Sequence, residues 1–171
     1  WMIATWESFG KPDKVNIVEL GPGDGSLIKI LLNVSRKFPK FNSAKRIFLY
    51  ETSSLLKKIQ KKNIKNNEIK WIKNFHDIKD GPVIFFGNEF FDAIPIKQFK
   101  KMKNKIYEKY FSINNSYKIK EILKSAKKKD LKNIHKFKTL KNLKFIEFPK
   151  FGFIELKKII KTISKQEGCL L

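Results

Sequence analysis

The feature that most constrains this chain is a short apolar run that ends directly in a glycine-rich loop. Residues 15–20 (Val-Asn-Ile-Val-Glu-Leu) are rich in β-branched side chains and bounded by turn residues, which predicts a buried strand. Residues 21–25 (Gly-Pro-Gly-Asp-Gly) follow at once. Glycines there let the backbone turn sharply and approach a ligand closely. A strand and a glycine loop in this order are typical of the ligand-binding edge of open α/β sheets.

The helix after the loop is expected to run from Ser26, which can cap it, to about Lys37. Phe38 and Pro39 are expected to end this helix. Four apolar side chains at helical spacing predict the face that it buries: Leu27, Ile30, Leu31 and Val34.

The chain up to Pro95 continues to alternate between strand and helix patterns. Apolar runs predict three further strands, at residues 46–51, 68–72 and 82–87. A second helix is expected at residues 54–63, with Thr52 or Ser53 as its cap. Strands separated by helices imply parallel βαβ units with right-handed crossovers. The predicted fold class is therefore α/β and Rossmann-like, with a mostly parallel sheet and helices on both faces.

The pattern changes after Pro95, where partial alternation of apolar and polar residues replaces the buried runs. We interpret this region as an antiparallel insertion with strands at residues 96–113 (turning at Asn104), 118–123 and 143–148. Its lysine-rich middle, residues 124–136, is expected to be exposed. An amphipathic helix at residues 151–164 and a strand from Gly168 then return to the parallel core.

The net charge of +22 comes almost entirely from lysine, since Arg36 and Arg46 are the only arginines. Lysine, asparagine and isoleucine are all abundant, as AT-rich codons produce, so we interpret the charge as compositional bias on a solvated surface. Proteins that read nucleic acids favour the planar fork of arginine, which this chain nearly lacks. Nucleic acid is therefore not expected as a partner.

Cysteine content and apolar run length bear on the compartment. Cys169 is the only cysteine, so the chain forms no internal disulfide, which fits a reducing compartment. No run approaches the roughly 18 consecutive apolar residues of a transmembrane helix. No histidine–cysteine cluster has metal-ligand spacing, and no metal is expected. A bacterial cytoplasm is the first expectation for location and the mitochondrial matrix the second.

Two acidic residues frame the glycine loop. Glu19, two positions before Gly21, suits a ligand that carries an ammonium group, as S-adenosylmethionine does. Glu51 ends the second predicted strand, where an acid can accept hydrogen bonds from both hydroxyls of a ribose. Gly21, Gly23 and Gly25 follow a GxGxG spacing, which matches neither the GxGxxG of dinucleotide enzymes nor a phosphate loop. An ordinary glycine turn and an acid favoured by a helix dipole are the alternatives, but the combination favours a nucleoside cofactor.

A third polar cluster follows the strand predicted at residues 82–87. Residues 88–95 read Asn-Glu-Phe-Phe-Asp-Ala-Ile-Pro, which is an unusual pattern for a core. Carboxylates at such a position can orient a basic acceptor nitrogen, while aromatic side chains exclude water. The alternative is a loop capped by Asp92 with both phenylalanines packed in the core. We favour a functional role for Asn88 and Glu89.

These segments together resemble the MidA family, which comprises the mitochondrial complex I assembly protein arginine methyltransferase and its bacterial relatives. The likeness rests on residues 18–23 (Val-Glu-Leu-Gly-Pro-Gly), 50–53 (Tyr-Glu-Thr-Ser) and 88–96, with support from residues 55–60 and 98–99. It covers about Trp6 to Phe99, and beyond that only the layout corresponds. The chain departs from the family pattern at Asp24, Ser26 and Gly87, where Arg, Thr and Ala are expected.

The resemblance implies a class I methyltransferase that moves a methyl group from S-adenosylmethionine to a protein arginine nitrogen, in connection with the assembly of respiratory complex I. Carried over by position, the cofactor-binding residues are Glu19, Gly21, Gly23, Gly25 and Glu51, and the methyl-transfer site is lined by Asn88, Glu89 and Asp92. Glu89 is the candidate for the carboxylate that holds the guanidinium. A methyltransferase for small molecules and a cofactor-binding assembly protein without turnover stay open as alternatives.

The predicted domain organisation follows from these assignments. Residues 1–95 form a cofactor-binding Rossmann-like core, residues 96–148 a substrate-facing insertion, and residues 149–171 a return to the core. The chain opens at Trp1 and closes as a strand begins, so we expect a fragment that lacks the last strands of the fold.

Overall fold

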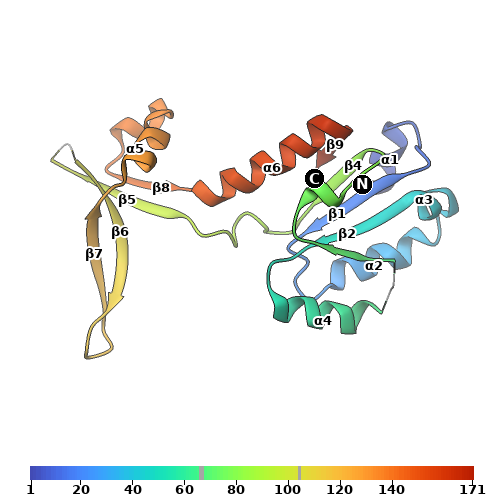
Figure 1. Ribbon diagram of the computed structural model, residues 1–171, viewed down its shortest axis with the longest axis horizontal. Coiled ribbons are helices and arrows are strands. Elements are labelled where there is room, and N and C mark those ends of the chain that lie inside the picture. The colour runs from blue at the N-terminus through green and yellow to red at the C-terminus, as the bar shows by residue number, and fades with distance from the viewer. Residues whose placement is uncertain (66–67, 104) are drawn as a thin grey trace. The chain divides into compact units, whose positions relative to one another are not determined.

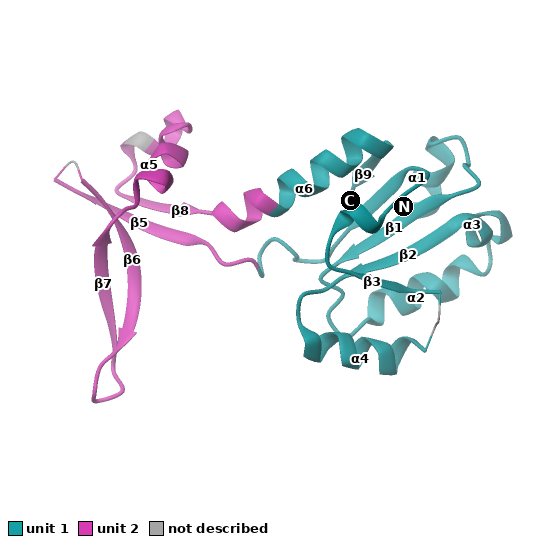
Figure 2. Ribbon diagram, in the orientation of Figure 1, with its two compact units in different colours: residues 1–93, 155–171 teal, residues 94–154 magenta. Residues whose placement is uncertain are grey.

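The computed structural model describes residues 1–65, 68–103 and 105–171, which divide into two compact units (Figure 2). Unit 1 comprises Trp1–Ala93 and Glu155–Leu171, and unit 2 comprises Ile94–Ile154. The sequence pattern put the corresponding boundaries after Pro95 and Phe148. The turn expected at Asn104 lies outside the described residues. Within these described residues, each unit has its own sheet, with two apolar clusters in unit 1 and one in unit 2.

Unit 1 is built on a five-stranded parallel sheet (Figure 1). Its strands, in the spatial order β3-β2-β1-β4-β9, are β3 (Lys70–Ile72), β2 (Lys45–Tyr50), β1 (Val15–Leu20), β4 (Val83–Phe86) and β9 (Gly168–Leu170). Every residue of β1 and β4 is buried, as expected when both faces of a parallel sheet are covered. The chain order reverses beside β1, which makes the carboxyl edge there the expected ligand site. The predicted α/β class and parallel sheet are confirmed.

Helices cover both faces of this sheet, with α2 and α4 on one side and α6 on the other (Figure 1). The helices that contribute to unit 1 are α1 (Met2–Ser8), α2 (Ser26–Ser35), α3 (Pro39–Ala44), α4 (Ser54–Ile64) and part of α6 (Lys150–Gln166), with a 3-10 turn η1 at Phe75–Asp77. One apolar cluster joins β1, β2 and β4 to the first four helices through Trp6, Ile28, Phe41 and Ile64. A second, on the opposite face, joins the strands to η1 and α6 through Phe75 and Ile159.

Helix α2 buries a different face from the one predicted. Three side chains of the predicted face are exposed: Leu27, Ile30 and Val34. Two others are buried in their place: Ile28 and Leu32. The helix is apolar on both faces, so periodicity alone does not select one. Its N-cap is Gly25, with φ of 86°, rather than Ser26, and the glycine loop thereby sets which face meets the sheet.

The other helix termini show the same dependence on local chemistry. Pro39, expected to end a helix, instead begins α3, because proline at the first helical position lacks an N–H that would be unsatisfied anyway. The cap predicted for α4 is confirmed at Ser53, whose hydroxyl oxygen accepts a hydrogen bond of 3.3 Å from the Leu56 N–H.

Unit 2 is built on a four-stranded antiparallel sheet, which confirms the predicted antiparallel insertion. In the spatial order β7-β6-β5-β8 its strands are β7 (Ile119–Ser125), β6 (Lys105–Ile113), β5 (Lys97–Met102) and β8 (Phe145–Phe148). Helix α5 (Lys128–His135), the 3-10 helix η2 (Lys138–Asn142) and the beginning of α6 complete the unit. Four buried side chains form its apolar cluster: Phe99, Ile134, Ile146 and Phe148.

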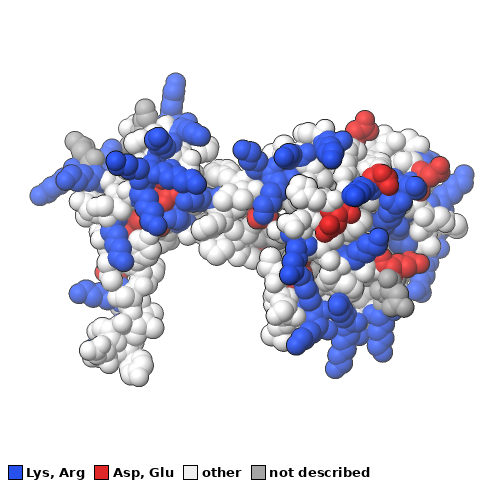
Figure 3. All heavy atoms as spheres, in the orientation of Figure 1, with Lys and Arg blue, Asp and Glu red and all other residues white. Residues whose placement is uncertain are grey.

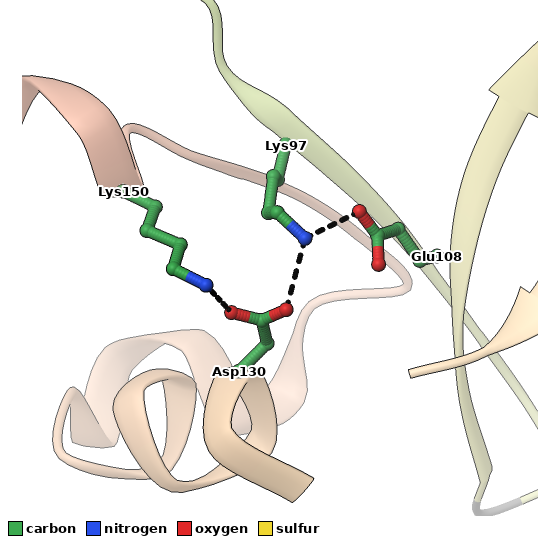
Figure 4. Close-up of polar contacts among 4 residues, drawn as sticks. All are labelled: Lys97, Glu108, Asp130 and Lys150. Atoms are coloured by element: carbon green, nitrogen blue, oxygen red, sulfur yellow. Dashed lines mark hydrogen bonds and ion pairs between the residues drawn. The ribbon is translucent and has the colours of Figure 1, made fainter. Parts of the chain in front are cut away.

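The sequence pattern predicted that the lysine-rich middle of unit 2 is exposed. The structure shows instead that part of this segment is buried. It contains α5, which buries Asp130 and Ile134. The Asp130 carboxylate accepts hydrogen bonds from Lys97 Nζ at 2.9 Å and from Lys150 Nζ at 2.6 Å, and Lys97 Nζ also lies 2.6 Å from Glu108 Oε1 (Figure 4). These contacts form a buried charge cluster of Lys97, Glu108, Asp130 and Lys150 that joins β5, β6, α5 and α6. Most other lysines lie on the surface of both units (Figure 3).

Candidate functional site

Strand register brings the loops after β1, β2 and β4 to one edge of the parallel sheet. Leu20 pairs with Tyr50, and Glu19 pairs with Phe86, so the three strands end at the same level. The Gly21 N–H donates a hydrogen bond of 3.0 Å to the Tyr50 carbonyl oxygen, which joins the first two loops directly. All three predicted clusters therefore lie at the edge where open α/β sheets bind ligands.

Glu19 presents a buried carboxylate oxygen without a partner. Its side chain is 3% exposed, and Oε2 makes no hydrogen bond within the described part of the chain. Burial, followed by the negative charge of Asp24, raises the pKa of Glu19 to about 7. An unpaired buried carboxylate is unfavourable, and a cationic ligand group would provide the missing partner. The site thus favours a ligand with a positive charge beside β1.

The three predicted glycines all adopt positive φ angles, of 61° at Gly21, 56° at Gly23 and 86° at Gly25. A Cβ at Gly21 would lie 3.1 Å from the Phe90 ring, and one at Gly25 would lie 2.8 Å from Ile64. A Cβ at Gly23 would meet no atom within 4 Å. Gly21 and Gly25 are therefore needed for close packing, whereas Gly23 leaves open space at the loop into which a ligand can fit.

Asp24, which departs from the family pattern, takes part in starting helix α2. Its Oδ1 accepts hydrogen bonds from the Ser26 N–H at 2.9 Å and from the Ser26 hydroxyl at 2.6 Å. These hydrogen bonds lower the pKa of Asp24. Its negative charge remains near Glu19, which strengthens the preference for a cationic ligand group.

Glu51 directly follows β2 and is 7% exposed. Its Oε1 accepts a hydrogen bond of 2.7 Å from the Ser53 N–H, and its Oε2 accepts one of 3.2 Å from Gln60 Nε2. A carboxylate oxygen has two lone-pair sites, so each oxygen retains one for a ligand hydroxyl. The orientation of Glu51 is thus held while both oxygens can still accept from a vicinal diol.

Gln60 and Asn63 of α4 contact the site and were not predicted as site residues. Gln60 Nε2 donates a hydrogen bond of 2.8 Å to the Gly23 carbonyl oxygen, and Asn63 Nδ2 donates one of 3.1 Å to the Asp24 carbonyl oxygen. The sequence held a signal for Gln60, because it lies four residues from both Leu56 and Ile64. A polar residue on the apolar face of an amphipathic helix indicates a buried hydrogen-bonding role.

The turn after β4 holds the three predicted reaction residues, Asn88, Glu89 and Asp92, all of them exposed. Glu89 adopts a φ of 54°, which is unusual for a residue with a side chain and is often found at functional sites. Phe90 is half-buried against Gly21 and near Tyr50, with ring centroids 6.2 Å apart. The structure therefore joins this turn to the glycine loop through Phe90, while the polar side chains remain accessible.

No helix in the described residues is long and apolar enough to cross a membrane. The described side chains also include no group of three or more histidine, cysteine or acidic residues that could hold a metal ion. The site is therefore characterised by its carboxylates, its glycine loop and its aromatic residues.

A five-stranded parallel sheet in the order β3-β2-β1-β4-β9, with helices on both faces, one acid near the end of β1 and one directly after β2, defines a Rossmann-like domain of the class I methyltransferase type. The model of a family described as putative S-adenosyl-L-methionine-dependent methyltransferase matches residues 1–171. The chain belongs to this family, which confirms the predicted MidA relationship. The predicted cofactor, S-adenosylmethionine, is the cofactor of the family.

Curated relatives and solved structures agree with this assignment. The protein arginine methyltransferase NDUFAF7 of Xenopus laevis is 30% identical over 128 residues, which cover 61% of this chain and 29% of that protein. The NDUFAF7 homologue of Caenorhabditis elegans is 32% identical over 133 residues, 66% of this chain and 31% of that protein. Both relatives are named mitochondrial, and this chain spans about three tenths of their length.

A similar fold is found in a protein of Burkholderia thailandensis that was crystallised with S-adenosyl-homocysteine. Its TM-score is 0.66 at 14% sequence identity, and the match covers 91% of this chain and 41% of that protein. At this identity the comparison establishes the fold.

Proposed function

We propose that this chain binds S-adenosylmethionine at the carboxyl edge of β1, β2 and β4 and forms the cofactor-binding part of a protein arginine methyltransferase. The observation that carries the proposal is the unpaired, buried Oε2 of Glu19 at the edge that also holds Gly23 and Glu51. These groups fit a cofactor with one cationic end and one ribose. The cationic end would pair with Glu19, and the ribose hydroxyls with Glu51.

The bound cofactor supplies an electrophilic methyl group on a sulfonium sulfur, and the residues of this chain supply alignment. Gly23 leaves room for the cofactor beside the loop. Phe90, packed between Gly21 and Tyr50, excludes water from that part of the edge. Gly21 and Gly25 allow the close packing that fixes the loop.

Asn88, Glu89 and Asp92 would bind the acceptor. A guanidinium keeps its proton to a pKa above about 12 and is a poor nucleophile. A carboxylate paired with it fixes its geometry and localises the positive charge on the nitrogens nearest the carboxylate, which leaves the remaining nitrogen better able to attack. As the N–C bond forms, the sulfonium S–C bond breaks, S-adenosylhomocysteine leaves, and the attacking nitrogen loses one proton. Glu89 is the residue we assign to this pairing, because its exposed side chain belongs to a turn held against the glycine loop by Phe90.

A protein arginine is the proposed acceptor because the curated relatives are named protein arginine methyltransferases. We extend this to a subunit of respiratory complex I, following the family resemblance. The mitochondrial names of the relatives favour the mitochondrial matrix over a bacterial cytoplasm as the location. Product analysis separates the alternatives, since methylarginine in a protein supports this acceptor and a methylated small molecule contradicts it.

The first test is calorimetric titration of S-adenosylhomocysteine into the full protein. We expect a dissociation constant on the order of 1–100 μM, and loss of measurable binding in Glu51→Ala. Glu7→Ala is the matched control, because Glu7 is an exposed acid of unit 1 that pairs with Lys11 and should leave affinity unchanged. A folded protein that binds no S-adenosylhomocysteine would contradict the cofactor assignment.

The second test addresses the reaction. Glu89→Gln should lower turnover by about 100-fold or more while leaving the affinity for S-adenosylhomocysteine within about twofold, because Glu89 is assigned to the acceptor. The reverse pattern, with weak cofactor binding and normal residual turnover, would show that Glu89 belongs to the cofactor site instead.

A further inference from the structure

The amide of Gln60 connects three separate elements of the candidate cofactor site. It lies on α4, is 0% exposed, and uses both ends of its amide group. Its Nε2 donates to the Gly23 carbonyl oxygen at 2.8 Å and to Glu51 Oε2 at 3.2 Å. Its Oε1 accepts a hydrogen bond of 2.9 Å from the indole N–H of Trp71 on β3. The glycine loop, the acid after β2 and the edge strand β3 therefore meet at one side chain.

Trp71 determines which way the Gln60 amide points. An indole N–H can only donate a hydrogen bond, so it must face Oε1 of the amide. Nε2, with its two hydrogens, then faces the two acceptors, Gly23 and Glu51. A flipped amide would point an oxygen at a carbonyl and a carboxylate and a donor at a donor, which leaves buried polar groups unpaired. The network therefore has one favourable arrangement.

This arrangement bears directly on Glu51. The carboxylate is held on one oxygen by the Ser53 N–H and on the other by Gln60. With both oxygens held, the carboxylate plane is fixed, and the remaining lone pairs point in fixed directions. Simultaneous recognition of two neighbouring hydroxyls needs such a fixed plane, whereas recognition of one hydroxyl does not.

We propose that Gln60 is a positioning residue that makes the site selective for a ligand with an intact ribose diol, by holding Glu51 and the glycine loop in a common arrangement. The proposal rests on the cofactor site proposed above. It assigns Gln60 no contact with the ligand itself, because the side chain is fully buried and both of its N–H donors are used by Gly23 and Glu51.

The test compares S-adenosylhomocysteine with its 2′-deoxyribose analogue by calorimetry on the full protein. The wild type should bind the parent at least about tenfold more tightly, because a site built for a hydroxyl rejects the analogue that lacks it. In Gln60→Leu the parent should weaken by about tenfold or more. The analogue should weaken far less, so that the ratio of the two affinities falls toward one.

Two further variants keep the test decisive if Gln60→Leu folds poorly. Trp71→Phe keeps an aromatic ring and removes the donor that orients the amide, so the affinity ratio should fall by a smaller factor with the fold intact. Gln98→Leu is the matched control, since Gln98 also donates to a carboxylate, that of Glu147, but in unit 2. It should leave the ratio unchanged.

The outcomes separate the two proposals. A ratio that collapses in the Gln60 and Trp71 variants alone supports the positioning role. Equal loss of affinity for both ligands would overturn it and leave Gln60 as a purely structural residue. A wild-type protein that is folded and binds neither ligand would instead overturn the proposed function, and the positioning role with it.

Discussion

The parallel sheet of unit 1 buries apolar side chains on both faces, whereas the antiparallel sheet of unit 2 buries a small apolar cluster and adds charged side chains to its interior. Unit 1 has two clusters that include residues such as Phe85 and Ile17, each 0% exposed. The described residues of unit 2 include four buried apolar side chains beside the charge cluster around Asp130. The two units therefore differ in the forces that stabilise them.

The two units also accommodate the positive charge of the chain in different ways. In unit 1 the strands near the centre contain almost no lysine, and most lysines of the helices are exposed. In unit 2 lysines occur within the strands, and two of the unit's lysines, Lys97 and Lys150, are directed onto buried Asp130. Burial of a charge is tolerable only when it is paired and hydrogen-bonded. We therefore expect the loss of Asp130 to destabilise its unit more than the loss of any single acid of unit 1.

The largest expected effect comes from removing that acid. Asp130→Asn should lower the free energy of unfolding of unit 2 by about 3 kcal/mol, because breaking a buried ion pair leaves the other charges uncompensated. Hydrogen exchange of the β5 and β6 amides measures it. Glu121→Gln is the matched control, since Glu121 is 40% exposed and pairs with Lys109 at 3.2 Å, and its loss should cost less than about 1 kcal/mol. Equal effects of the two substitutions would show that buried Asp130 stabilises unit 2 no more than an exposed acid does.

The pH dependence of unit 2 follows from the same residue. Burial acts to raise the pKa of Asp130, but hydrogen bonds and charge from Lys150 and Lys97 outweigh burial and lower it overall. A lowered folded-state pKa contributes stability above the unfolded value, near 3.9, that is lost as the pH falls through the folded value. Unit 2 should therefore lose protection below about pH 4, and Asp130→Asn should lack this transition.

The next effect concerns Glu19, the acid of unit 1 that lacks a hydrogen-bond partner on Oε2. Its pKa of about 7 lies above the ordinary value of 4.5, so its contribution to stability is fully present below pH 4.5 and is lost as the pH rises through about 7. Glu19→Gln should thus make unit 1 more stable at pH 8, by up to about 3 kcal/mol, and change little at pH 4. Denaturant unfolding at both pH values measures the difference.

The same substitution should have the opposite effect on ligand binding. The wild type should bind S-adenosylhomocysteine more tightly above pH 7 than below it, because only the ionised Glu19 attracts the ligand ammonium. Glu19→Gln should bind more weakly and without this pH dependence. A variant that gains stability and keeps full affinity would show that Glu19 is buried for a reason unrelated to the ligand.

The contrast between the units also explains which parts of the fold could be predicted from the sequence. Continuous apolar runs such as Val15–Leu20 predicted the central strands, because a strand buried on both faces leaves little choice. The apolar face of α2 was predicted wrongly because the helix is apolar on both sides. Helix α5 was not predicted because its sequence is rich in lysine. The burial of Asp130 depends on Lys97 and Lys150, which lie far from it in the sequence.

The residues of the candidate site likewise differ in how far the sequence predicts them. The position of Glu19, the glycines and Glu51 at the sheet edge was predictable because each lies at a fixed distance from the end of a strand. For Gln60 the sequence indicated only a buried polar residue on the apolar face of α4, since its role at the site depends on three partners from other elements, Gly23, Glu51 and Trp71. Local pattern therefore indicates residues at strand ends, whereas the partners of a side chain that connects several elements emerge only from the packing.

The smallest expected effect concerns the N-terminus of helix α5 in unit 2. Helix α4 of unit 1 is capped by Ser53, whereas Lys127 at the N-cap of α5 makes no side-chain capping hydrogen bond. Lys127 has φ of −65° and ψ of 141°, the extended conformation that a capping residue needs. Lys127→Ser should therefore stabilise unit 2 by about 0.5–1 kcal/mol relative to Lys127→Ala, which removes the same charge without adding a cap. Exchange protection of the α5 amides reports the gain. If the serine and alanine variants are equally protected, α5 depends on Asp130 and Ile134 alone, and the stability of unit 2 resides wholly in its buried contacts.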